Sequence, residues 1–197
     1  MSLPQSLTRT VAPTVEPVSL AEAKKHLEIQ ELDQTHDSAI NRMIQAAREQ
    51  VEKELAVCLV NQTYTLSMRK FPSEDVDKGS IRIDKKPVSS ITSITYYDSN
   101  NAQQTLGTGV YGLDAERSTV YLKYDQEWPS ITEQHNGIVI TAVIGYGATA
   151  ATVPEHAKHQ ILIQIQEWFD PLQRKGGVEA YDRLYKRFAN PDYLHGI

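Results

Sequence analysis

Ala142-Val143-Ile144-Gly145-Tyr146-Gly147-Ala148 decides the fold of this 197-residue chain, together with Val153-Pro154 just after it. The first residues form an apolar β segment, and the two glycines supply a short turn. Pro154 suits the first turn of a helix, where its missing amide proton is not needed. The helix that it opens stays apolar on more than one face through Trp168-Phe169-Asp170. The sequence therefore predicts a β region that leads through one turn into a core helix buried on two sides. The helix from Asp37 is one expected partner, and the other is either the sheet or a neighbouring subunit.

Two helices are predicted earlier in the chain, within residues 19–58. Ser19-Leu20-Ala21-Glu22 fits a capping box, in which the Ser19 hydroxyl accepts an amide proton and Glu22 reaches back to the Ser19 amide. A short helix should run from Leu20 to about Ile29. A second helix should run from Asp37 to about Ala56, because apolar residues recur there at helical spacing: Ile40, Met43, Ile44, Ala47, Val51 and Leu55.

The other face of this second helix is charged. Its residues are Arg42, Gln45, Arg48, Glu49, Glu52 and Lys53. The ordinary interpretation of such a face is contact with solvent. The alternative is a contact between subunits, since opposite charges on successive turns suit a neighbouring copy. We take Arg48, Glu49 and Glu52 as candidate residues of a subunit interface.

From Gln62 to Thr141 the pattern changes to a period of two. Tyr64, Leu66 and Met68 alternate with Thr65 and Ser67, and similar alternation returns up to Ile138, Ile140 and Ala142. Asp98-Ser99-Asn100-Asn101 has the composition of a hairpin turn. We expect an antiparallel sheet of five or six strands, as a sandwich or small barrel. The predicted fold class is α+β, with a helical core and an inserted antiparallel β domain.

The domain organisation that follows has five parts. Residues 1–18 contain Pro4, Pro13 and Pro17 and predict an extended arm. The helix pair of residues 19–58 comes next, then the β region of residues 60–147. Residues 152–175 form the core helix. Gly176-Gly177 then acts as a hinge before a mobile docking segment, residues 176–197.

Composition excludes several classes of protein. The formal net charge of −5 argues against nonspecific duplex binding, which needs clustered lysine and arginine. The single cysteine, Cys58, cannot form an intramolecular disulfide, and its apolar neighbours predict a small buried side chain. No stretch is long and apolar enough to span a bilayer, and the N-terminus lacks the apolar part of a signal peptide. We expect a cytoplasmic location and no membrane partner.

No cluster of residues predicts a reaction. Gly107-Thr108-Gly109-Val110-Tyr111-Gly112 has the spacing of a dinucleotide fingerprint, but turn and strand residues follow it in place of a helix. His156 and His159 share a helix face without a third metal ligand at a recognisable spacing. Glu127-Trp128-Pro129 resembles part of a sugar site, although Trp128 is as readily a loop anchor. We expect no catalytic residues, cofactor or metal.

The C-terminal segment interleaves aromatic and basic residues. An amphipathic helix with an aromatic stripe more often docks on protein than on nucleic acid, and Glu179 and Asp182 interrupt the basic run. The predicted docking residues are Tyr181, Arg183, Leu184, Tyr185, Lys186, Arg187 and Phe188.

The order of these pieces resembles the head-tail connector, or head-completion adaptor, proteins of long-tailed phages and prophages. The residues that carry the resemblance are the opening Val18 to Leu27, the helix with Ile44 to Glu52, the strand from Pro87 to Tyr97, Trp128-Pro129, and Gly145-Tyr146-Gly147 with Val153-Pro154. The chain is similar to the longer members, in which a β region is inserted into a helical core.

The resemblance implies a structural adaptor with no enzymatic activity. Such proteins form a ring, commonly of twelve subunits, below the portal, and the ring extends the DNA channel toward the tail. The C-terminal segment is implicated in gripping the portal, and a tail-side connector or stopper protein would lie on the other side. DNA would pass without sequence-specific binding, at the head-tail junction of the virion, after assembly in the host cytoplasm. The alternatives are a β-rich tail or receptor-binding accessory module and, more remotely, a carbohydrate-active enzyme that uses Glu127.

Overall fold

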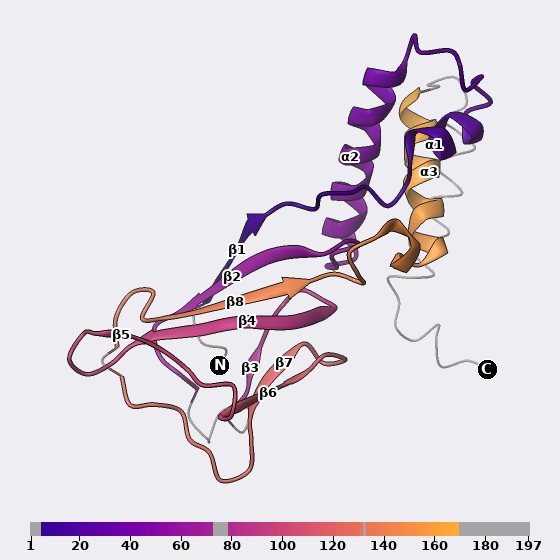
Figure 1. The fold of residues 1–197 in the computed structure, drawn as a ribbon. Helices are drawn as coiled ribbons and strands as arrows, with labels where there is room; N and C mark the ends of the chain where they lie inside the picture. Colours follow the sequence, from indigo (N-terminus) through magenta and orange to yellow (C-terminus); the bar gives the residue numbers. More distant parts are fainter. Residues whose placement is uncertain (1–4, 73–78, 132, 170–197) are drawn as a thin grey trace. The chain divides into compact units, whose positions relative to one another are not determined.

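The structure is a computed structural model that describes residues 5–72, 79–131 and 133–169. It combines helices with antiparallel sheets, so the predicted α+β class is confirmed. The chain divides into two compact units, and each unit is built from separate stretches of sequence (Figure 1). The β unit comprises Met1–Thr14 and Ala56–Ala148, and the helical unit comprises Val15–Leu55 and Thr149–Ile197.

Three helices form the described part of the helical unit: α1 (Leu20–His26), α2 (Asp37–Glu54) and α3 (Glu155–Phe169), with a short 3-10 turn at Ala150–Thr152 before α3. The predicted capping box begins α1, since the Glu22 amide donates to the Ser19 hydroxyl at 3.2 Å and the Ser19 amide donates to the Glu22 carboxylate at 2.7 Å. The helix ends at His26, earlier than the expected Ile29. Glu28 adopts a φ of 58°, and the amide of Ile29 donates back to the Lys24 carbonyl at 2.9 Å. These features form a Schellman-type end, which stops the helix.

The helical unit buries one apolar stripe of each long helix. Ile40, Ile44 and Val51 of α2 are almost fully buried, as are Ile161 and Ile165 of α3. Helix α3 packs on α2, as predicted, and also contacts α1. The second partner of α3 is thus a helix, where the sequence left open a sheet or a neighbouring subunit.

The β unit contains two antiparallel sheets. The larger one has the order β1-β2-β8-β4-β5, and the smaller one has the order β3-β7-β6. The strands of the larger sheet are β1 (Gln5–Val11), β2 (Gln62–Met68), β8 (Ile138–Ile144), β4 (Val88–Tyr97) and β5 (Gln103–Thr105). Those of the smaller sheet are β3 (Ile81–Arg82), β7 (Thr119–Leu122) and β6 (Tyr111–Asp114). The predicted hairpin at Asp98 to Asn101 joins β4 to β5 and is confirmed.

Strand alternation places one face of the larger sheet in an apolar core. Leu66, Ile140 and Ile94 lie opposite one another on three adjacent strands and are buried. Ile81, Tyr111 and Val120 of the smaller sheet belong to the same core cluster, so the two sheets share one interior. Cys58 is fully buried within it, as predicted.

Gly145 occupies a position that other residues do not fit. Its φ is 149°, and a Cβ atom there would lie 2.6 Å from the backbone of Val60 and Asn61. Its amide donates to the Pro87 carbonyl at 2.8 Å. The glycine turn singled out in the sequence therefore fixes the end of β8 against two neighbouring chain segments.

The N-terminal residues differ from the expected arm of residues 1–18. Gln5–Val11 forms β1, which pairs along its length with β2 at one edge of the larger sheet. Pro13 and Pro17 lie after the strand, so they do not interrupt the pairing. The segment Val15–Leu55, which follows directly, belongs to the helical unit. The extended segment is thus part of both units.

Candidate interaction surfaces

The charged residues predicted on the outer face of α2 form a buried ion cluster. Arg48 is 1% exposed, and its Nε lies 2.7 Å from the Glu16 carboxylate. Its Nη1 donates to the Glu52 carboxylate at 2.9 Å, one helical turn away. The adjacent carboxylates raise the pKa of the Arg48 guanidinium, although burial acts in the opposite direction as the largest single influence. Arg48 therefore stays charged, and it ties the segment before α1 to the middle of α2.

This cluster corrects the interface prediction for two of its three residues. Arg48 and Glu52 are buried inside the helical unit, so neither presents its charge to solvent or to a neighbouring subunit. The physical reason is that Glu16, distant in sequence, supplies a partner that makes burial of the guanidinium tolerable. Glu49 is partly exposed, with its carboxylate 3.6 Å from Arg48 Nη2.

An exposed polar stripe does run along α2, and it is the predicted charged face without Arg48 and Glu52. Its exposed members recur at three- and four-residue steps and are Arg42, Gln45, Glu49 and Lys53. The stripe carries charges of both signs. Of the predicted interface residues, only Glu49 belongs to this surface.

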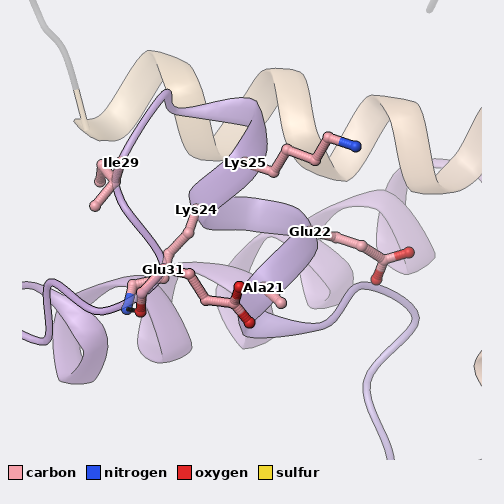
Figure 2. Close-up of a pocket in the computed structure, with 6 residues that line it drawn as sticks. All are labelled: Ala21, Glu22, Lys24, Lys25, Ile29 and Glu31. Atoms are coloured by element: carbon pink, nitrogen blue, oxygen red, sulfur yellow. Dashed lines mark hydrogen bonds between the residues drawn. The ribbon is translucent and has the colours of Figure 1, made fainter.

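A pocket of about 380 Å³ lies beside α1 (Figure 2). Ala21, Glu22, Lys24, Lys25, Ile29 and Glu31 line it. The Lys24 amine is already occupied, since it lies 2.6 Å from the Asp37 carboxylate and donates to the Glu31 carbonyl at 2.9 Å. Figure 2 shows Glu22 and Lys25 extending to one side of α1, while Lys24 runs toward Glu31. With charges of both signs around it, the pocket favours no ligand class.

Two large apolar side chains at turns are highly exposed, and neither was among the predicted interface residues. Leu32, between α1 and α2, is 92% exposed, and Tyr124, after β7, is 98% exposed. Each stands between polar residues in a turn, in Glu31-Leu32-Asp33 and Lys123-Tyr124-Asp125. An apolar residue within a polar turn could have indicated them.

The other residues considered for nucleotide, sugar or metal binding lie in loops and at the start of a helix. Gly107 and Gly109 precede strand β6, so no helix follows the glycines to meet a phosphate. Trp128 anchors a loop, because its indole donates to the Gly79 carbonyl at 2.6 Å and its ring stacks on Phe71 at a centroid distance of 4.7 Å. His156 and His159 are exposed at the start of α3.

Within residues 5–72, 79–131 and 133–169, no group of three or more histidine, cysteine, aspartate or glutamate side chains could hold a metal ion. Over the same ranges, no helix has the length and apolarity needed to cross a membrane. The predicted docking residues of the C-terminal segment lie outside the described residues; they are Tyr181, Arg183, Leu184, Tyr185, Lys186, Arg187 and Phe188.

Residues 17–111 match the family of phage gp6-like head-tail connector proteins. The matched region contains α1 and α2 and extends through β2 to the start of β6. The resemblance to head-tail connector proteins that the sequence predicted is confirmed by this match. A comparison with curated protein sequences finds no match.

Three solved structures of gene transfer agent particles share the fold. The neck of an empty particle, computed with C6 symmetry, contains a chain with a TM-score of 0.68 and 18% identity, covering 83% of each chain. The virion of the native particle contains a chain with a TM-score of 0.64 and 17% identity, and the match covers 83% of each chain. The neck of the native particle, computed with C12 symmetry, contains a chain with a TM-score of 0.64 and 18% identity. That match covers 83% of this chain and 82% of the other. At these identities the likeness establishes the fold.

Proposed function

We propose that this chain is a structural adaptor that forms a ring at the neck of a phage-like particle, joins head to tail and continues the DNA channel. The observation that carries the proposal is the family match over residues 17–111. The fold likeness extends the similarity beyond that region, to proteins of particle necks. The proposed place of action is the head-tail junction, with assembly in the host cytoplasm.

A cyclic ring requires a heterologous contact, in which two different patches of one chain meet. The exposed stripe of α2 is our candidate for one patch, because Arg42, Glu49 and Lys53 offer charges of both signs to a neighbour. The C6 and C12 symmetries of the similar necks support a ring of twelve copies. Arg48 and Glu52 act inside the subunit in this proposal.

The proposed partners are the portal on one side and a tail-side connector or stopper protein on the other. We assign portal docking to the C-terminal segment, in which an aromatic stripe would be covered by the portal and the basic residues would meet carboxylates at the rim. Those residues are Tyr181, Leu184, Tyr185 and Phe188, with Arg183, Lys186 and Arg187.

Particle production without this protein tests the function. Heads should fill with DNA and accumulate apart from finished tails, and addition of the purified protein should restore joined particles. A normal yield of joined particles in its absence would contradict the adaptor role.

Deletion of residues 178–197 tests the docking segment separately. The truncated protein should keep the melting temperature of the full chain to within about 2 °C, since a ΔΔG of 1 kcal/mol shifts the melting temperature of a domain this size by about 2–4 °C. It should no longer bind filled heads in a co-sedimentation assay. Docking by the truncated protein would reject the assignment while leaving the adaptor role intact.

A further inference from the structure

The larger sheet of the β unit has a second face, turned away from the apolar core, which we call the hydroxyl face. The strand registers define it, because residues paired across strands share one face. Thr8, Thr65, Thr141 and Ser93 form one row across four strands. Ser67, Val139 and Thr95 form a second row, and Thr63, Val143 and Ser90 form a third.

The hydroxyl face is uncharged, although 23% of the chain's residues are charged. At its strand positions in the described structure it carries only small hydroxyl, valine, glutamine and tyrosine side chains: Ser6, Thr8, Val11, Thr63, Thr65, Ser67, Ser90, Ser93, Thr95, Tyr97, Gln103, Thr105, Val139, Thr141 and Val143. Each is exposed or half-buried. An ordinary solvated sheet face carries lysine and glutamate at such positions, so the absence of charge needs a cause.

Burial against another protein is one cause, since charges are depleted from interface cores. Such cores, however, are held by aromatic, arginine or other large anchors that fill pockets. On the hydroxyl face the central rows contain none, and Tyr97 stands at one end. The centre of the hydroxyl face therefore consists of small side chains without large anchor residues. Such a surface favours a weak and transient contact with its partner.

We propose that the hydroxyl face lines the channel and is the wall past which duplex DNA moves. Serine and threonine hydroxyls can donate single hydrogen bonds to phosphate oxygens, but without lysine or arginine they release few counterions and retain DNA weakly. Without aspartate or glutamate they also raise no electrostatic barrier to a polyanion. A wall of this chemistry lets DNA pass at a rate that depends little on sequence or salt. This assignment rests on the proposed adaptor function.

Site-specific photo-crosslinking tests the assignment in assembled particles. Cys58 is the chain's single cysteine and is fully buried, so a cysteine introduced on the surface can be labelled selectively with a benzophenone maleimide. Thr141→Cys places the probe in the middle of the hydroxyl face, and Thr8→Cys provides an exposed edge position if the first variant folds poorly. Arg82→Cys is the matched control, because Arg82 is exposed on the smaller sheet, on the opposite side of the shared core.

After irradiation of filled particles, the probe on the hydroxyl face should give at least tenfold more DNA adduct than the probe at position 82. Adducts to a neighbouring subunit in place of DNA would show a protein interface and overturn the proposal. DNA adduct no higher than in the control would also overturn it. Mass spectrometry of the particles before irradiation reports separately on the adaptor role, since a protein absent from the neck would refute that role.

A charge substitution gives a second readout. Thr65→Lys with Thr141→Lys adds cations at paired positions of two central strands. DNA release should slow several-fold at low salt and recover as salt rises, while Thr65→Val with Thr141→Val should release DNA at the normal rate. An unchanged rate in the lysine variant at low salt, or loss of particle assembly by a folded lysine variant, would overturn the proposal.

Discussion

The β unit fills its interior with apolar side chains, whereas the helical unit buries charge. The core of the β unit consists of isoleucine, leucine, valine and aromatic residues, with Cys58, Met68 and Ala142. In the helical unit, Lys24, Arg48 and Glu52 are each less than 5% exposed. Among the described residues, every buried charged side chain belongs to the helical unit.

The difference shows two ways to hold a small unit together. A sheet face presents its side chains in a regular array, so one apolar surface can pack on another without polar groups. Three helices of different length leave gaps between them that long polar side chains can fill. Burial of a charged side chain is tolerated there when it forms an ion pair or hydrogen bonds. Stability in the helical unit should therefore depend on specific pairs, and stability in the β unit on packed volume.

The largest expected effect comes from removing the buried guanidinium. Arg48→Met should lower the free energy of unfolding of the helical unit by about 3–5 kcal/mol, because it removes the cation that forms an ion pair with the buried Glu52 carboxylate. Urea unfolding followed by helical circular dichroism measures this change. Arg42→Met, at an exposed position of the same helix, should change stability by no more than about 0.5 kcal/mol. Equal effects of the two variants would show that the buried ion pairs of the helical unit contribute no more to stability than an exposed arginine does.

Packed volume is tested at Ile140, which is fully buried between Leu66 and Ile94. Ile140→Ala should cost about 3 kcal/mol, through lost transfer free energy and the cavity that remains. The adjacent Thr141→Ala, on the hydroxyl face, should cost less than about 1 kcal/mol in the same urea titration. A large loss from the threonine variant would show that both faces of the sheet are packed.

A smaller effect is expected where the helical unit begins. Ser19→Ala should cost about 1 kcal/mol, because it removes the hydroxyl that accepts the Glu22 amide proton. The hydrogen bond from the Ser19 hydroxyl, followed by that from its amide, lowers the pKa of Glu22. A lowered pKa means that this contribution is complete above the usual glutamate pKa of about 4.3 and is lost as the pH falls through the lowered value.

Acid titration of stability therefore separates the charge from the cap. Between pH 5 and pH 3, the native protein should lose more stability than Glu22→Gln, as measured by thermal unfolding at each pH. Parallel curves for the two proteins would show that the carboxylate contributes nothing to the capping box.

The smallest effect on stability is expected on the exposed stripe of α2. Glu49→Lys should change the free energy of unfolding by no more than about 0.5 kcal/mol. It should nevertheless weaken ring assembly at low salt, measured by mass photometry, if a neighbouring subunit faces this stripe. Glu116→Lys, in the exposed turn between β6 and β7, is the matched control. Identical assembly of the two variants would leave the stripe as a solvated surface.

Local rules in the sequence predicted much of this fold. The capping box, the hairpin after β4 and the strands with alternating Tyr64, Leu66 and Met68 each depend on neighbouring residues. The partner that makes burial of Arg48 tolerable is Glu16, 32 positions earlier in the chain, and helical periodicity could not reveal this partner. One signal was present, since Arg48 follows Ile44 and precedes Val51 on the same stripe of the helix.

Long-range pairing also determines the structure at the N-terminus, where the sequence predicted only an extended conformation. The prolines that predicted an arm flank Gln5–Val11, and the strand forms because β2 offers it an edge. Surfaces were the least predictable part. The hydroxyl face becomes visible only when the registers of five strands are known, because its members are scattered from Ser6 to Val143.

The divided make-up of the helical unit has a consequence for synthesis on the ribosome. Helix α2 ends at Glu54 and α3 begins at Glu155, so 100 residues (55–154) must be translated before the third helix appears. At about 5–20 residues per second, α1 and α2 wait roughly 5–20 s with Ile40, Ile44 and Val51 uncovered by α3. Meanwhile the β unit, complete at Ala148, has all its strands. A nascent chain therefore has every strand of its β unit before the third helix of its helical unit is made.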